Sequence, residues 1–308
     1  MSFFFSWRRP KEVASADADP FDDEFQRKLE SLALVSRRVF AGRIRAERRT
    51  KKSGSGVEFA DYRDYQPGDD FRSVDWNVYQ RFERLLVRLY AEEEDLAIYF
   101  LLDASASMSF GTGKKAAYAR RVVAALAYVG LANLDRASIV TISDRVTKRM
   151  PETRGRARIF KAFRFLREVE FAGATDLGDA MKTFVAQNKR RGLAVIVSDL
   201  YDPNGFARGI NILRYHKFDP FVVHIIDPAE AAPKLHGDVL VRDCETGDER
   251  EVTVTASVLD ELSRAHAQYT AEIERFCAAH QVSYVAANVE RPLEELILRV
   301  FRKGGFLR

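Results

Sequence analysis

The sequence predicts an α/β fold in which helices cover a doubly wound, mostly parallel sheet, preceded by a small N-terminal β-rich subdomain. From residue 96 onward, short apolar runs alternate with longer helix-like segments, which is the pattern of a parallel sheet. The first run, 96–102, is apolar at every position, as expected for a strand buried on both faces of the sheet. With 308 residues, of which 46% are hydrophobic, the chain can bury a substantial core.

The individual elements follow from the positions of the apolar runs and turn signals. Besides 96–102, we expect strands at 137–142, 193–197, 221–226 and 282–286, with 145–150 as a hairpin partner of 137–142. We expect helices at about 114–133, 157–168, 177–189, 206–215, 257–280 and 293–301. A surface hairpin is expected over 239–254, turning at 245–248. In such sheets, ligands bind at the carboxyl ends of strands, where the strand order reverses.

The N-terminal region has a different character. Residues 1–20 are polar and are expected to form a flexible leader. Residues 21–90 are expected to hold a helix over 22–40 and a β-rich subdomain of short strands and turns, with Trp76 as a core anchor. The α/β domain then occupies 91–308.

Composition excludes several classes of protein. The net charge of +4 is too small to indicate nucleic-acid binding by itself. Cys244 and Cys277 are too few for a disulfide framework or a cysteine-based zinc site. The longest apolar run, 122–132, is far shorter than the roughly 20 residues of a membrane span. We therefore expect a cytoplasmic protein without a transmembrane segment.

Polar side chains gather where the expected strands end. Asp103, Ser105 and Ser107 follow the first strand, Asp199 follows the strand 193–197, and Thr175 precedes a helix start. Any one of these loops alone would be interpreted as a helix cap. Three such loops at one edge of the sheet instead offer carboxylate and hydroxyl oxygens without imidazole or thiolate, a set that suits Mg²⁺ or Mn²⁺.

The motif Asp103-x-Ser105-x-Ser107, with Thr175 and Asp199, resembles the metal-ion-dependent adhesion site of the von Willebrand factor A domain, a Rossmann-like fold. The resemblance implies that these five residues hold Mg²⁺ (or Mn²⁺) and that a partner's carboxylate completes the metal shell.

One detail departs from that family's pattern. The distal motif is usually Thr-Asp-Gly, whereas this chain has Ser198-Asp199-Leu200. Asp202 is close enough in the sequence to compete with Asp199 for the role of the distal aspartate. Asp176, next to Thr175, is a further candidate for the outer shell of the metal site.

The block upstream of the first strand points to one particular family that contains such a domain. The segments 53–59 and 63–72, followed by Val74-Asp75-Trp76, are similar to the signature of the bacterial family domain of unknown function 58. Members of that family often accompany MoxR-type AAA+ ATPases, so the resemblance implies a non-enzymatic adaptor or co-chaperone of such an ATPase. The charged residues of this block are expected to form ion pairs and turn caps, with a recognition surface as the alternative.

Two other functions remain open. A metal-dependent hydrolase or phosphatase would use the same site, but the five histidines lie outside its loops and the strand ends in Asp-Ala-Ser rather than Asp-x-Asp. Residues 111–115 resemble the end of a phosphate loop but lack its other positions, so the glycines are expected to turn the chain into a helix.

The segment 37–52, with eight Lys or Arg and one Glu, could bind nucleic acid or an anionic surface, although nucleic acid is not the expected partner.

Overall fold

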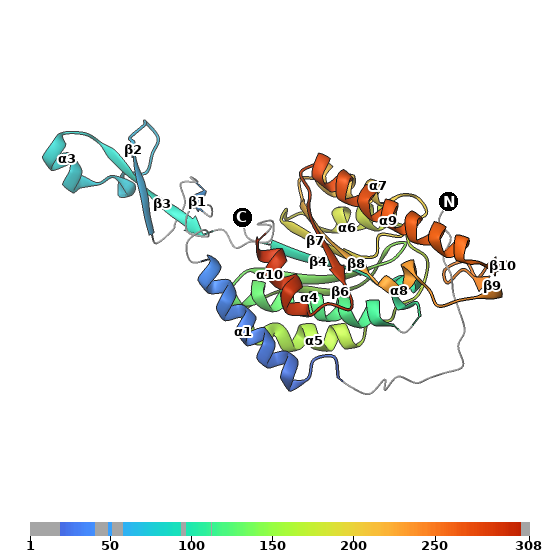
Figure 1. The fold of residues 1–308 in the computed structure, drawn as a ribbon. Coiled ribbons are helices and arrows are strands. Elements are labelled where there is room, and N and C mark those ends of the chain that lie inside the picture. The colour runs from blue at the N-terminus through green and yellow to red at the C-terminus, as the bar shows by residue number, and fades with distance from the viewer. Residues whose placement is uncertain (1–18, 41–48, 51–57, 94–96, 112, 303–308) are drawn as a thin grey trace. The chain divides into compact units, whose positions relative to one another are not determined.

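The computed structural model describes residues 19–40, 49–50, 58–93, 97–111 and 113–302. The chain divides into two compact units, one formed by Met1–Ser36 with Leu96–Phe306 and the other by Arg37–Asp95 with Leu307–Arg308 (Figure 1). The expected leader lies outside the described residues apart from its last two positions, and most of the basic segment 37–52 lies outside them as well.

The larger unit is built on a six-stranded sheet with the order β11-β8-β7-β4-β5-β6. The strands are β4 (Ala97–Asp103), β5 (Arg136–Ile142), β6 (Val146–Arg154), β7 (Leu193–Ser198), β8 (Asp219–Ile226) and β11 (Ser283–Asn288). All neighbours pair in parallel except β5 and β6, which form the expected antiparallel hairpin. The α/β prediction with a mostly parallel sheet is therefore confirmed.

The strand order reverses at β4, because β5 lies on one side of β4 and β7 on the other. Every residue of β4 and β7 is buried, which is why their sequences are continuously apolar rather than alternating. Their carboxyl ends meet at the switch point of the sheet, the usual place for a ligand.

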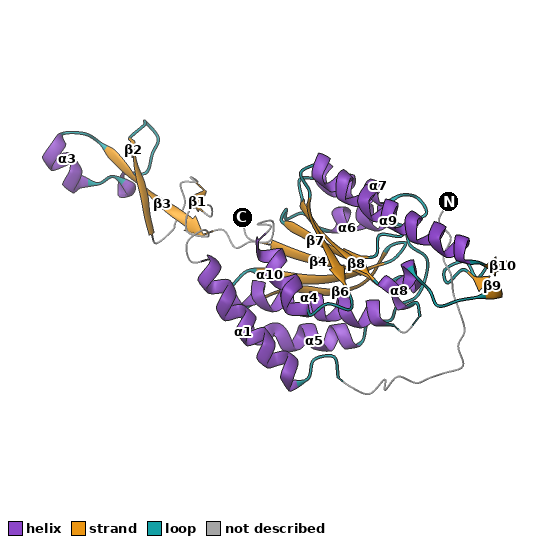
Figure 2. Cartoon of the chain, in the orientation of Figure 1, coloured by secondary structure: helices purple, strands orange, loops and turns teal. Residues whose placement is uncertain are grey.

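Helices cover both faces of this sheet (Figure 2). One face carries α4 (Lys114–Ala132), α5 (Ile159–Arg167) and α10 (Leu293–Arg302), and the other carries α6 (Leu177–Gln187), α7 (Phe206–Tyr215) and α9 (Ala256–Ala279). Apolar side chains of α6, α7 and α9 form one core cluster with the strands. The short helix α8 (Pro228–Ala231) leads to the expected hairpin of β9 (Gly237–Arg242) and β10 (Glu249–Val254).

The N-terminal helix α1 (Asp23–Phe40) is assigned through Ser36 to the larger unit, whereas the sequence analysis grouped it with the β-rich block. The reason is aromatic packing, since the ring of Phe21 stacks on that of Phe163 with centroids 4.7 Å apart, and Phe25 contacts both rings. Among the described helices, none combines the length and apolar character that a membrane crossing requires.

The smaller unit contains a three-stranded antiparallel sheet with the order β1-β3-β2. Its elements are β1 (Arg49–Thr50), β2 (Glu58–Asp64), the 3-10 turn η1 (Phe71–Ser73), α3 (Trp76–Phe82) and β3 (Leu86–Glu93). The helix α3 was not expected from the sequence, which suggested strands and turns alone.

The anchor of the smaller unit is Asp75 rather than Trp76. Asp75 is 4% exposed, caps α3 through the backbone amides of Asn77 and Val78, and accepts a hydrogen bond of 2.6 Å from the Tyr62 hydroxyl. The guanidinium of Arg88 pairs with the same carboxylate and holds its pKa well below the usual range. Trp76 is 53% exposed, so the prediction that it anchors the core is wrong.

Candidate functional site

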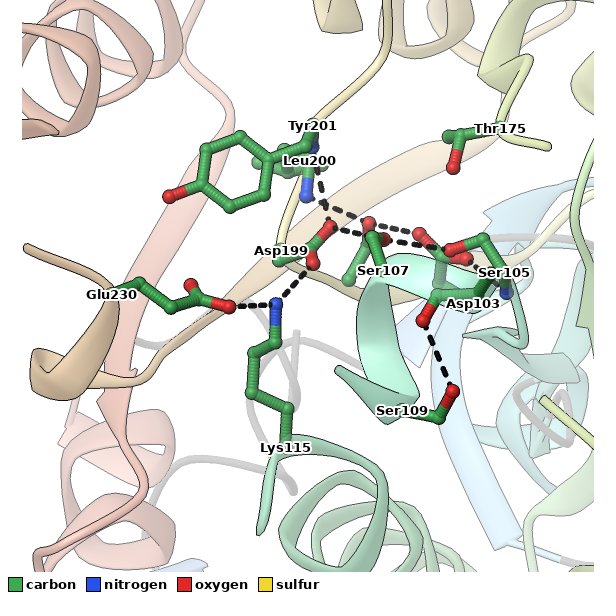
Figure 3. Close-up of polar contacts among 12 residues, drawn as sticks. Asp103, Ser105, Ser107, Ser109, Lys115, Thr175, Asp199, Leu200, Tyr201 and Glu230 are labelled. Carbon is green, nitrogen blue, oxygen red and sulfur yellow. Dashed lines mark hydrogen bonds and ion pairs between the residues drawn. The ribbon is translucent and has the colours of Figure 1, made fainter. Parts of the chain in front are cut away.

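Four of the five predicted site residues meet at the carboxyl ends of β4 and β7. Asp103 is the last residue of β4, Asp199 follows β7, and the 3-10 turn η2 (Ala106–Ser109) brings Ser105 and Ser107 between them (Figure 3). The Oγ atoms of Ser105 and Ser107 lie 3.0 Å apart, and Ser107 Oγ donates to Asp199 Oδ1 at 3.4 Å. All four side chains are buried. We call these four residues the Ser–Asp cluster.

Asp103 is held by hydrogen bonds and not by a basic group. Its Oδ1 accepts from the Ser105 amide at 2.9 Å, and its Oδ2 accepts from Ser198 Oγ at 2.5 Å. Burial raises the pKa of Asp103 to about 7, and the charge of Asp199 adds to the rise. In the described part of the chain no lysine, arginine or histidine pairs with Asp103, so a bound cation would be the group that favours its ionised form.

Asp199 has a cationic partner that the sequence analysis missed. Lys115, from the first turn of α4, places Nζ 2.7 Å from Asp199 Oδ2 and 2.5 Å from Glu230 Oε1 on α8 (Figure 3). The Lys115 side chain is only 2% exposed. Burial alone would lower the pKa of Lys115, but the charges of Asp199 and Glu230 outweigh it and raise that pKa. For Glu230, an acid, burial has the opposite effect and raises the pKa to about 7.

A signal for Lys115 was present in the sequence. It precedes Ala119, Val122 and Leu126 at helical spacing, on the face of α4 that is buried in the structure. The neighbouring prediction is confirmed, because Gly111 and Gly113 adopt φ angles of 70° and 71° and lead the chain into α4. Glu230 offered no comparable signal, since α8 is a single turn that was not expected.

Thr175, the fifth predicted residue, makes different contacts. Its hydroxyl donates to Glu245 Oε1 at 2.7 Å, and its amide donates to Glu245 Oε2 at 3.0 Å. Figure 3 draws Thr175 without a hydrogen bond to the Ser–Asp cluster. Glu245 lies in the turn of the β9–β10 hairpin and was not singled out in the sequence.

The two alternative acids serve as caps. Asp176 caps α6 by accepting from the amide of Asp179, and Asp202 accepts from the amides of Leu177 and Asn204. These contacts leave Asp199 as the acid of this loop that joins the cluster.

Leu200 occupies the position where the adhesion-site pattern has glycine. Its φ is 60°, in the left-handed region that favours glycine, and its side chain is fully buried. Its amide donates to Ser198 Oγ at 2.8 Å, and its carbonyl accepts from the Tyr269 hydroxyl at 2.5 Å. These bonds hold the turn that places Asp199 beside Ser107.

The donor set fits a hard divalent cation. It consists of carboxylate and hydroxyl oxygens, the ligands that Mg²⁺ and Mn²⁺ prefer, and one buried carboxylate lacks a basic partner in the part of the chain that is described. No group of three or more His, Cys, Asp or Glu side chains suited to a metal occurs among the described residues. A site here would therefore rest on two acids supplemented by hydroxyls.

Comparison with known proteins decides the family. The profile described as "Protein of unknown function DUF58" matches residues 61–272, more than half of the chain. The chain belongs to the DUF58 family.

Curated relatives cover most of the chain. Uncharacterized proteins of Mycobacterium tuberculosis and Mycobacterium bovis are 27% identical over 271 residues, covering 86% of this DUF58 protein and 84% of each relative. An uncharacterized protein of Mycobacterium avium is 31% identical over 100 residues, covering 32% of this chain and 59% of that protein.

Solved structures were also matched. The conserved hypothetical protein BatB of Bacteroides thetaiotaomicron aligns with a TM-score of 0.42 and 13% identity, covering 68% of this chain and 98% of that chain. An aerotolerance-related membrane protein of Bacteroides fragilis aligns with a TM-score of 0.43 and 14% identity over the same shares.

Proposed function

We propose that this DUF58 protein is a non-enzymatic, metal-dependent protein-binding module of the von Willebrand factor A type. In this proposal Asp103, Ser105, Ser107, Thr175 and Asp199 form a metal-ion-dependent adhesion site for Mg²⁺ or Mn²⁺. The observation that carries it is the buried Ser–Asp cluster at the switch point of the sheet, where the Asp103 carboxylate has no basic partner in the described part of the chain.

The residues of the site have separate roles in this proposal. Asp103 supplies charge, and the hydroxyls of Ser105 and Ser107, already 3.0 Å apart, turn toward the same point. Asp199 orients Ser107 by accepting its hydroxyl, while the Lys115 ammonium lies 2.7 Å from the other oxygen of the same carboxylate. When bound, the divalent ion supplies strong attraction for an anionic ligand, which we take to be an acidic side chain of a partner protein.

The proposed partner is a MoxR-type AAA+ ATPase, for which the chain would act as an adaptor or co-chaperone. Support comes from the family resemblance carried by the upstream block and the Asp-x-Ser-x-Ser motif, together with the DUF58 membership. The proposal assigns the interaction to the strand-end edge of the larger unit.

Among the described residues, the cluster shows no nucleophile paired with a histidine base, which supports a binding role over a hydrolytic one. Among the described residues, no histidine or cysteine hydrogen bonds to the side chains of the Ser–Asp cluster, and the buried His224 places Nδ1 3.0 Å from the Tyr284 hydroxyl. Purified protein should therefore show no turnover of phosphoesters or nucleoside triphosphates that is lost in Asp103→Ala.

Metal binding is tested by thermal unfolding with Mg²⁺ or Mn²⁺ and with EDTA. A ligand that binds only the folded state adds about 2.7 kcal/mol at 100 times its Kd, which corresponds to several degrees in Tm for a protein of this size. The shift should vanish in Asp103→Ala and persist in Asp260→Ala, which removes an exposed carboxylate on α9. An equal shift in wild type and Asp103→Ala would place the ion elsewhere and reject the site.

Partner binding is tested by pull-down of the purified ATPase. Capture should need the divalent ion and fail in Ser105→Ala, while Asp260→Ala behaves as wild type. A complex that forms equally well in EDTA would reject the metal-dependent interface.

A further inference from the structure

A strongly basic surface covers the strand β6 and the helix α5. Residues 145–167 contain nine Lys or Arg and one acid, Glu152, which gives this segment a net charge of +8 against +4 for the whole chain. All nine basic side chains are exposed, and we call them the basic surface. They are Arg145, Lys148, Arg149, Arg154, Arg156, Arg158, Lys161, Arg164 and Arg167.

The basic surface is continuous because β6 leads directly into α5. In the described structure β6 pairs with β5 alone and forms an edge of the six-stranded sheet. The 3-10 turn η3 (Arg156–Arg158) connects it to α5. Lys148 Nζ donates to the carbonyl oxygen of Glu168, just beyond α5, at 3.2 Å, so the strand and the helix lie side by side.

Most of the basic surface is not neutralised by neighbouring acids. Arg156 pairs with Glu30 of α1 at 2.7 Å. Arg167 pairs with Asp19 at 2.6 Å. Four of the other side chains have no acidic partner among the described residues, and these are Arg145, Arg158, Lys161 and Arg164.

The charges of α5 oppose the helix to which they belong. Arg158 is its N-cap and makes no side-chain capping bond, and its first turn contains no acid, although the helix dipole favours acids there. Lys161, Arg164 and Arg167 follow one another at three-residue spacing, at which like charges repel. Bases on an edge strand can serve to prevent pairing with other chains, which accounts for those of β6 but not for those of α5. Charges placed against such local rules are expected where an external anion neutralises them.

The composition of the basic surface favours the phosphates of a lipid membrane. Seven of its nine bases are arginines, whose planar guanidinium groups bind phosphate through two hydrogen bonds. Between Arg158 and Lys161, the ring of Phe160 is 60% exposed and stands perpendicular to the ring of the buried Phe163, with centroids 6.1 Å apart. Clustered bases together with an exposed aromatic side chain are typical of attachment to anionic lipids.

Nucleic acid and acidic proteins match this surface less well. Residues 145–167 are described throughout and contain no Asn or Gln, the amides that read adenine. Phe160 is their one exposed aromatic side chain, whereas binding of single strands uses several such rings. The core of a protein interface is usually depleted of charge. Attraction to an anionic membrane instead adds up over separate Lys and Arg residues and needs no complementary shape.

We propose that the basic surface binds the anionic face of a phospholipid membrane. Its guanidinium and ammonium groups contact the headgroup phosphates, and the ring of Phe160 enters the boundary between headgroups and acyl chains. This attachment is peripheral and requires neither a membrane-spanning helix nor a metal ion. It is therefore independent of the proposed function.

The test is co-sedimentation of the full chain with vesicles of phosphatidylcholine, either alone or mixed with phosphatidylserine. EDTA is present so that no divalent ion bridges protein and lipid. The double variant Lys161→Ala, Arg164→Ala removes two unpaired bases of α5. The matched control is Arg264→Ala, Arg275→Ala, which removes two exposed bases from α9 on the opposite face of the sheet. Circular dichroism establishes that both variants are folded.

Wild type and the α9 control should bind the vesicles that contain phosphatidylserine, and binding should weaken as salt is added. The α5 double variant should bind about 25-fold more weakly, because each Lys or Arg near an anionic surface contributes about fivefold. Phe160→Trp reports insertion of the ring. Its tryptophan fluorescence should be quenched by brominated lipid more strongly than that of wild type, which provides the baseline for Trp7 and Trp76.

Three results would overturn the proposal. Equal affinities of the α5 double variant and the α9 control would assign vesicle binding to another segment, such as 37–52. Tighter binding of duplex DNA or of polyglutamate than of the vesicles, lost in the α5 double variant, would identify a different anionic partner. Quenching in Phe160→Trp no stronger than in wild type would show that this surface does not meet the lipid.

Discussion

Replacing Lys115 by methionine tests whether the buried charges of the site are balanced as the structure indicates. The Lys115 ammonium lies 2.7 Å from Asp199 Oδ2 and 2.5 Å from Glu230 Oε1, with 2% of its side chain exposed. Methionine fills most of the same volume, so the loss is mainly one of charge rather than packing. Asp199 and Glu230 are then left as buried acids without their cation. Removing one partner of a buried ion pair costs about 3–5 kcal/mol, a large part of the 5–15 kcal/mol that stabilises a typical domain.

The measurement is urea denaturation at pH 7 in EDTA, followed by far-UV circular dichroism, so that no metal ion replaces the missing charge. For a unit of this size the expected loss corresponds to a Tm lower by about 6–20 °C. Lys182→Met is the control, because its ion pair with Asp179 is exposed on α6 and is worth less than about 1 kcal/mol. Adding Glu230→Gln to Lys115→Met should restore part of the loss, since one unpaired acid is removed. A loss in Lys115→Met no larger than in the control would refute this account of the site.

Two further predictions concern His224 and Leu200. Burial lowers the pKa of His224 from 6.5 to about 4, so between these values the unfolded chain binds a proton that the folded chain does not. The free energy of unfolding should therefore fall by about 3 kcal/mol as the pH decreases from 6.5 to 4, and His224→Gln should remove this part of the slope in denaturation curves recorded across that range; identical slopes would contradict the assignment. Leu200→Ala should cost about 2–5 kcal/mol through lost core packing, whereas Leu200→Gly also relieves the positive φ and should be about 1 kcal/mol more stable than the alanine variant, though less stable than wild type. The reverse order in chemical denaturation would show that the backbone angle is not the deciding factor.

Much of the larger unit could be predicted from local sequence. The apolar run of β4, the hairpin of β5 and β6 and the alternation of helices and strands are short-range patterns that report burial directly. Because parallel neighbours end at the same edge, the same reasoning predicted that Asp103 and Asp199 lie at one edge, and in the structure Asp199 contacts Ser107 while Asp103 contacts Ser105. The charged block of the smaller unit was also expected to form ion pairs, and Arg63 with Asp69 is one of them.

Local sequence reasoning failed where a residue's role depends on a distant partner. A tryptophan is usually a core anchor, but Trp76 begins α3, a helix with no buried residue, and the buried residue beside it is Asp75, which caps the helix and pairs with Arg88. The helix α1 was grouped with its sequence neighbours, although Phe21 and Phe25 pack on Phe163 in the larger unit.

The sequence by itself determined the fold class, the family and the oxygen-rich strand ends of this DUF58 protein, because these depend on periodicity and on motifs within a few residues. Only the tertiary structure decided which charges accompany those strand ends. Lys115 reaches Asp199 across 84 residues of sequence, and Glu245 reaches Thr175 across 70. The helical spacing of Lys115 places it on the buried face of α4, but it does not identify Asp199 or Glu230 as partners, because those acids lie in distant segments that only the fold brings beside it.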